Sequence, residues 1–276
     1  MSKKRLLAML FAVVIIVVIG VLAGVVFVVR DVDININDGE GMENEISVED
    51  ILEAANIQKG KSIFSISESK VVSNIESQFP TLRVKGVERV FPNKIIISLV
   101  ERIPLIAIKF KDKNEYLVLD NNMCVITKIE YTSDEERDEK LKDYCVVKGT
   151  ELEGARQIYY GKTLPRIYGD EVVMVENIVS GLIDSGMNLT QVKEFLDGIS
   201  FDKSEKTVFV ETKYSTKSGV TIMFSYKGID KDTKLVYKRV MEAREFYINL
   251  ETSQKASGYL KYNEENDEFY YDMHLK

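Results

Sequence analysis

The chain has 276 residues, with 44 acidic side chains against 37 basic ones and a formal net charge of −7. Its first 30 residues hold four basic side chains and no acid, so the rest carries 33 basic against 44 acidic residues, about −11. This acidic balance disfavours nucleic acid and anionic lipid headgroups as partners of the larger part of the chain.

An apolar run without a charged or strongly polar side chain extends from Leu6 to Val29. As a helix that rises ~1.5 Å per residue, it would measure roughly 36 Å and exceed the ~30 Å hydrocarbon core of a bilayer. Basic residues precede the run at positions 3–5, and acidic residues follow Arg30 at 31, 33 and 38. Because positive charge stays in the cytoplasm, we expect a cytoplasmic tail at 1–5, a transmembrane helix at 6–29 and an extracytoplasmic remainder.

A cleaved secretory signal is the alternative interpretation of this run. The apolar region of such signals usually measures 7–15 residues and ends at a small-x-small site. The run here is longer, and Val21-Leu22-Ala23 matches that site poorly. The sequence therefore favours an uncleaved anchor.

Residues 30–103 have the pattern of a small mixed module. Val32, Ile34 and Ile36 alternate with polar residues, which is typical of a strand. Ser47 and Ser67 each precede an acidic, amphipathic stretch, as helix N-caps do. The pattern predicts the order β-α-α-β-β, with elements at residues 32–36, 48–55, 68–79, 82–90 and 95–102.

Several short motifs in this module resemble the POTRA domain of the FtsQ/DivIB family of cell-division proteins. They lie at residues 47–52 (SVEDIL), 60–64 (GKSIF), 91–95 (FPNKI) and 101–104 (ERIP). Residues 116–120 (YLVLD) are similar to the step into that family's second, β-rich domain. The resemblance covers nearly the whole chain, strongly in the first module and thinly after residue 120.

Residues 104–276 predict a β-rich domain with flanking helices, so the fold class is α+β. Apolar spacing predicts helices at 171–183 and 233–250, and alternation predicts hairpins at 207–226 and 258–275. Residues 132–142 are almost all charged or polar, which indicates an exposed loop or frayed helix. Cys124 and Cys145 leave two alternatives open, a disulfide or two separate buried thiols.

The sequence offers no recognisable catalytic or metal centre. Its one histidine, His274, lies two residues from the end, and two cysteines with one histidine cannot form a Cys/His zinc site. The chain has no H-E-x-x-H motif and no phosphate-binding glycine loop. We therefore expect no enzymatic activity, no cofactor and no small-molecule substrate; a membrane-anchored cell-wall hydrolase is a remote alternative.

The last predicted hairpin is the candidate contact surface. An exposed edge strand has unpaired backbone groups, and aromatic side chains are enriched in interface hot spots. We expect a partner strand to add to this edge, although alternate tyrosines that simply pack inward are an equal alternative. The predicted partner-binding residues are Gly258, Tyr259, Leu260, Tyr262, Phe269, Tyr270 and Tyr271.

The resemblance implies a non-catalytic, single-pass scaffold of the bacterial divisome, enriched at the septum, that helps regulate septal peptidoglycan synthesis. It implies FtsB/DivIC-like and FtsL-like proteins as partners, bound through the distal part of the second domain. A second candidate surface is the sheet edge of the first module at Val84–Val90. The alternative is a POTRA-containing interaction protein of another envelope complex, such as a sporulation or secretion complex.

Overall fold

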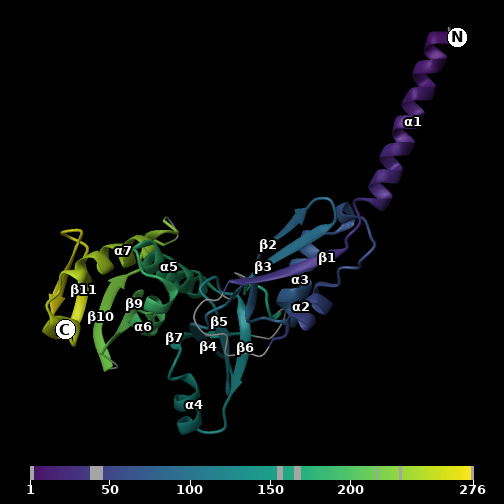
Figure 1. Cartoon of the computed structure of the whole chain (residues 1–276). Coiled ribbons are helices and arrows are strands. Elements are labelled where there is room, and N and C mark those ends of the chain that lie inside the picture. Colours follow the sequence, from purple (N-terminus) through teal and green to yellow (C-terminus); the bar gives the residue numbers. More distant parts are fainter. Residues whose placement is uncertain are drawn as a thin grey trace. The chain divides into compact units, whose positions relative to one another are not determined.

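The computed structural model describes residues 3–37, 46–153, 158–164, 169–215, 217–229 and 232–274, without the side chains at positions 3–8, 22, 23 and 37. The chain divides into two compact units, Met1–Arg102 and Ile103–Lys276 (Figure 1). Both helices and strands occur in each unit, as the predicted α+β class requires.

The first unit contains a helix, α1, followed by a three-stranded sheet with helices against it. The sheet order is β1-β3-β2, with β1 parallel and β2 antiparallel to the central strand β3. The predicted order β-α-α-β-β after α1 is confirmed. The elements are α1 (Lys3–Val25), β1 (Asp31–Asn37), α2 (Val48–Ala55), the 3₁₀ turn η1 (Ile63–Ser65), α3 (Glu68–Gln78), β2 (Leu82–Val90) and β3 (Lys94–Glu101).

Local sequence explains where the two short helices begin and end. The Ser47 hydroxyl accepts a hydrogen bond from the backbone N–H of Asp50 at 3.1 Å, which caps α2. Asn56 ends α2 in the left-handed conformation, with φ of 50°, a role that asparagine tolerates. Ile51 from α2 and Ile75 from α3 pack against the sheet in one fully buried core.

The second unit is built on one nine-stranded sheet, in the order β12-β11-β10-β9-β8-β7-β4-β5-β6. The hairpins predicted around residues 207–226 and 258–275 are confirmed as the antiparallel pairs β9–β10 and β11–β12. The strands are β4 (Ile106–Phe110), β5 (Glu115–Leu119), β6 (Val125–Glu130), β7 (Cys145–Leu152), β8 (Leu196–Asp202), β9 (Thr207–Tyr214), β10 (Lys217–Ser225), β11 (Tyr259–Asn263) and β12 (Glu268–Asp272).

Helices pack on both faces of this sheet. Apolar residues of α5, α6 and α7 share one core with the strands, whereas Leu141 of α4 packs with Ala107 and Tyr116 in a separate cluster. Ile106 and Ile108 belong to the first core, so alternation along β4 places Ala107 and α4 on the opposite face. The helices are α4 (Asp134–Leu141), α5 (Asp170–Asp184), α6 (Leu189–Phe195), α7 (Leu235–Ile248) and α8 (Thr252–Lys255).

Candidate functional site

Strand β12 is the outer strand at one end of the nine-stranded sheet. Its inner neighbour β11 lies parallel to β10 and antiparallel to β12, and within the described chain β12 pairs with β11 alone (Figure 1). The outer side of such a strand has backbone N–H and C=O groups that another strand can pair with. The geometry of the last hairpin is therefore compatible with strand addition.

The predicted site residues lie on both faces of this hairpin. Leu260 and Phe269 are in the main core, and Tyr262 and Tyr271 pack against it. By alternation, Tyr259 and Tyr270 lie on the opposite face, where Tyr270 is 43% exposed. Gly258 precedes β11 with φ of +92°, and a Cβ there would lie 2.7 Å from the Tyr271 hydroxyl. Gly258 is thus a structural requirement of the hairpin, and Tyr270 is the member most accessible to a partner.

A buried lysine holds the two strands together, and the sequence reasoning did not identify it. The Lys261 ammonium donates to the Asp272 carboxylate at 2.8 Å and to the carbonyl of His274 at 2.7 Å. The hydrogen bond from Lys261 is the largest cause that lowers the pKa of Asp272. This pairing fixes the C-terminal end of β12 against β11. A lone lysine within an aromatic hairpin gives no sequence signal for such a role.

A second set of contacts, here called the hairpin clamp, joins α7 to the β11–β12 turn. It consists of Arg239, Tyr262 and Asp267. The Arg239 guanidinium carbon lies 3.4 Å from the centroid of the Tyr262 ring, and the Tyr262 hydroxyl donates to the Asp267 carboxylate. Arg239 also contacts Asp267 at 3.4 Å. The clamp therefore fixes the position of the edge strand relative to α7.

The hairpin clamp shifts the pKa values of Tyr262 and Asp267. Burial, followed by the hydrogen bond to Asp267, raises the pKa of Tyr262 to about 12. The same hydrogen bond is the largest cause that lowers the pKa of Asp267. Because the folded pKa of Asp267 lies below its unfolded value of ~3.9, its stabilising effect is complete above that value and disappears as pH falls through the folded pKa.

Replacing Asp267 with asparagine is expected to loosen the hairpin at neutral pH. Asp267 has a φ of +56°, which asparagine also tolerates, so the substitution changes charge without straining the backbone. Hydrogen exchange of the full chain should be faster over residues 259–272 in Asp267→Asn than in wild type at pH 7. The difference should shrink as pH falls from ~3.9 through the lower pKa of the folded state, below which the wild-type carboxylate is protonated.

The matched control is Glu264→Gln, which makes the same change from carboxylate to amide in the same exposed turn. It should leave exchange over residues 259–272 unchanged. Equal exchange rates for Asp267→Asn and wild type at pH 7 would show that the clamp does not stabilise the hairpin.

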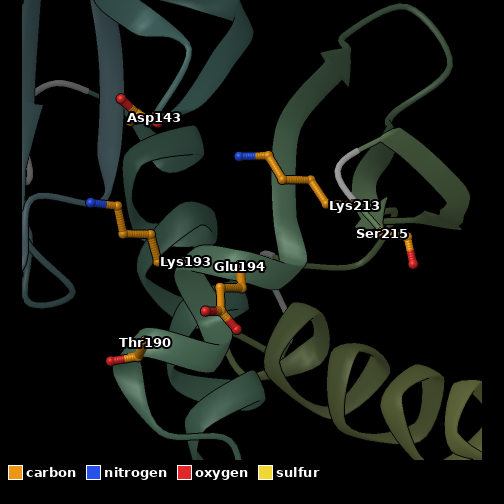
Figure 2. A pocket seen from close by; sticks show the side chains of 6 residues that line it. All are labelled: Asp143, Thr190, Lys193, Glu194, Lys213 and Ser215. Atoms are coloured by element: carbon orange, nitrogen blue, oxygen red, sulfur yellow. The ribbon is translucent and has the colours of Figure 1, made fainter.

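A surface depression of about 650 Å³ lies between α6 and the end of β9. Figure 2 shows Thr190, Lys193 and Glu194 projecting from α6, and Lys213 reaching toward the same space from β9. Asp143 and Ser215 complete the described lining. Two lysines facing two carboxylates give a charge-balanced surface, with no histidine or cysteine among these lining residues.

Cys124 and Cys145 are both buried, and no disulfide joins them. Of the two alternatives that the sequence left open, the structure supports separate thiols. Burial raises the pKa of the Cys145 thiol, which keeps it protonated and unreactive at neutral pH.

The second predicted surface, at Val84–Val90, lies on β2, an outer strand of the three-stranded sheet. A register shift between Val84 and Gly86 interrupts the pairing of β2 with β3, and Lys85 and Glu88 are exposed. Bulges and charges are devices by which edge strands avoid unwanted pairing. This edge is therefore less suited to strand addition than β12.

Over the range that the structure describes, no helix is both long enough and apolar enough to cross a membrane. The span predicted at Leu6–Val29 includes positions 6–8, 22 and 23, whose side chains lie outside the described residues.

Comparison with known proteins places the first unit in a family. Residues 40–102 match the family model of the FtsQ-type POTRA domain. The cell division protein DivIB of Clostridium tetani (strain Massachusetts / E88) is 36% identical over 83 residues, which is 30% of this chain and 30% of that protein. The matched stretch thus spans less than a third of the relative's length. Together with the β-α-α-β-β order of the first unit, these similarities show that the chain contains an FtsQ-type POTRA domain and is similar over this part to a DivIB cell-division protein.

Proposed function

We propose that the chain is a non-catalytic scaffold of the bacterial cell-division machinery, held in the cytoplasmic membrane by one helix. In this proposal residues 1–5 are cytoplasmic, 6–29 span the membrane, and the POTRA domain (30–103) and β-rich domain (104–276) lie outside. The uncharged run from Leu6 to Val29 supports the anchor. So do the large apolar side chains described between Met9 and Val25, which are 43–67% exposed and need an apolar environment.

The observation that carries the proposal is the outer edge of β12, with which no other strand of the described residues pairs. A strand from another single-span division protein, FtsB/DivIC-like or FtsL-like, would pair with this edge by β-augmentation. Backbone pairing supplies affinity in this mode, and an exposed aromatic such as Tyr270 supplies contact area. By holding such partners together at the septum, the chain would help regulate septal peptidoglycan synthesis without catalysing it.

A fluorescent fusion of the full chain tests the cellular role. Accumulation at mid-cell, with filamentation when the protein is depleted, is the expected result. Uniform membrane fluorescence, or confinement to a forespore, would contradict the divisome role and favour another envelope complex.

In the same depleted cells, a Tyr270→Lys variant tests whether the outer edge of β12 binds a partner strand. Lysine on an outer strand opposes pairing with a further strand, and loss of an aromatic hot spot weakens binding by about 2 kcal/mol. We expect Tyr270→Lys to lower the affinity for the partner ectodomains roughly thirtyfold and to restore division poorly.

The control is Tyr159→Lys, the same change at a tyrosine of the second unit that is 65% exposed. It should bind partners and restore division like wild type. If Tyr270→Lys does the same with an intact fold, the β12 edge is not the partner site.

A further inference from the structure

Three phenylalanines, one partly buried (Phe27) and two exposed (Phe64 and Phe91), form a cluster where α1 meets the POTRA domain, and we call it the Phe triad. Phe27 follows α1, Phe64 lies in η1, and Phe91 lies in the turn between β2 and β3. Their ring centroids are 5.6–5.9 Å apart. Phe64 is 59% exposed and Phe91 55% exposed. Aromatic side chains that contact one another and yet face solvent indicate a surface that meets an apolar partner.

Backbone hydrogen bonds fix the triad relative to the chain that leaves α1. Ile63 N–H donates to the carbonyl of Phe27 at 2.9 Å, and Val29 N–H donates to that of Lys61 at 2.9 Å. Arg30 N–H donates to the carbonyl of Asn93, in the β2–β3 turn, at 2.8 Å. The segment after α1 is thus hydrogen-bonded to the loops that present Phe64 and Phe91.

If α1 anchors the chain in the membrane, the position of the Phe triad in the sequence determines how deep in the bilayer the triad lies. The part of α1 after the proposed cytoplasmic tail, residues 6–25, is about 30 Å long, which matches the ~30 Å hydrocarbon core. Phe27 comes two residues after the last helical residue, Val25. Phe64 and Phe91 lie within 6 Å of Phe27 and so at the same depth, the headgroup region. Amphipathic surfaces in this region bury their apolar face ~5–10 Å into the boundary of the acyl chains.

Three basic residues lie on the backbone segments that adjoin the triad. Arg30, Lys59 and Lys61 are exposed, and their backbone segments are joined by the hydrogen bonds of Val29 to Gly60 and Lys61. The part of the chain after α1 is acidic as a whole. Because salt screens interactions between charges beyond ~8 Å, a bilayer next to the Phe triad interacts mainly with the charged side chains close to the triad. Cations next to a membrane are attracted to anionic headgroups.

We propose that the Phe triad is a membrane-docking surface, in which Phe64 and Phe91 insert into the outer interface of the anchoring bilayer. Arg30, Lys59 and Lys61 contact the phosphates of anionic lipids. This inference rests on the proposed anchoring of α1. Docking holds the POTRA domain in one orientation against the membrane, so the domain does not rotate freely about its connection to α1.

The chain has no tryptophan, so a single introduced tryptophan reports on one position. The full chain is reconstituted in vesicles of phosphatidylglycerol and phosphatidylcholine, whose acyl chains are brominated either near the headgroup or near the bilayer centre. We expect the emission of Phe64→Trp to be blue-shifted and quenched by the shallow bromine label. The control Val48→Trp, at the start of α2 and 42% exposed, should have water-like emission without quenching.

A third reporter separates failure of the inference from failure of the anchor. Phe11→Trp lies in α1, and the deep label should quench it. If Phe11→Trp is quenched while Phe64→Trp is water-like, or blue-shifted without quenching as in contact with a second protein copy, docking is refuted. If the deep label does not quench Phe11→Trp, the proposed anchor itself is refuted.

The lysines are tested in the Phe64→Trp background. Lys59→Glu with Lys61→Glu should reduce quenching in vesicles with phosphatidylglycerol and leave it unchanged in neutral vesicles. Equal quenching in both lipids would contradict the assignment of these lysines to anionic headgroups.

Discussion

Replacing Gly149 with alanine is expected to destabilise the second unit by roughly 2–5 kcal/mol, the sum of backbone strain and overpacking. Gly149 lies in β7 with φ of +78°, and a Cβ at this position would lie 2.1 Å from the carbonyl oxygen of Phe201 in β8. A backbone atom cannot move aside as a flexible side chain can. The two strands must therefore separate locally or the variant must adopt a strained backbone.

Gly186→Ala is the matched control because Gly186 belongs to the same unit and also has positive φ, +97°, but nothing lies within 4 Å of its Cβ position. It should cost only the ~1–2 kcal/mol of the left-handed conformation. Hydrogen exchange of the second unit in the full chain compares the two variants. Equal losses of stability in the two variants would show that the close contact between Gly149 and the Phe201 carbonyl does not limit the side chain at position 149.

The expected consequence reaches the candidate site because β7 is an inner strand of the same sheet. It pairs with β4 on one side and β8 on the other, and so joins two groups of strands. The extra residues of β7 opposite the register shift from Ile108 to Phe110 place Gly149 where only glycine fits. If β12 binds a partner as proposed, loosening this junction should lower that binding in proportion to the fraction unfolded.

The POTRA elements were predictable because their signals are local. Ser47 predicts its own cap, and the alternation of Val32, Ile34 and Ile36 predicts β1. The same holds for α5 and α7, whose apolar spacing matches their buried residues. Turn residues between apolar runs likewise predicted the two hairpins of the second unit.

Residues 132–142 show where such signals fail. The structure has a helix here, α4, with the Ser133 hydroxyl accepting from the N–H of Glu136 at 3.2 Å. Leu141 is its one buried residue, and a single apolar position creates no helical periodicity. The expected loop or frayed helix is thus a capped helix that covers part of one sheet face.

The pairing of strands that lie far apart in the chain could not be predicted from the sequence either. β10 and β11 are parallel neighbours, although α7 and α8 separate them in the chain, and no local pattern specifies that crossover. For the same reason the sequence does not determine which face of the sheet each hairpin tyrosine lies on. Only the registry of β11 with β10 and β12 determines that Tyr262 packs inward and Tyr270 does not.

Removing the Arg102 side chain is expected to destabilise the POTRA domain by about 3–5 kcal/mol. Arg102 and Glu76 form an ion pair at 3.2 Å, with side chains only 6% and 12% exposed. The Glu76 carboxylate also accepts the N–H of Val84 at 3.0 Å, and Arg102 donates to the carbonyl of Leu82 at 3.1 Å. Arg102→Ala would leave this buried carboxylate without the guanidinium that balances its charge.

A double replacement distinguishes a balanced pair from two independent contacts. Glu76→Leu with Arg102→Met removes both charges, so its cost should be smaller than the sum of the two single replacements. It should not be neutral, because the buried N–H of Val84 loses its acceptor at a cost of about 1–3 kcal/mol. The exposed pair of Lys94 and Asp33 is the control, and Lys94→Ala should cost no more than ~1 kcal/mol.

Hydrogen exchange of the full chain is the suitable measurement, since a chain of two units has no single free energy of unfolding. In Arg102→Ala, exchange should accelerate throughout residues 46–102 and stay unchanged in the second unit, because the two hydrophobic cores share no residue. Equal acceleration in both units would mean that they unfold together. Additive costs in the double replacement would mean that Glu76 and Arg102 act separately, with the backbone contacts of Val84 and Leu82 carrying the stabilisation.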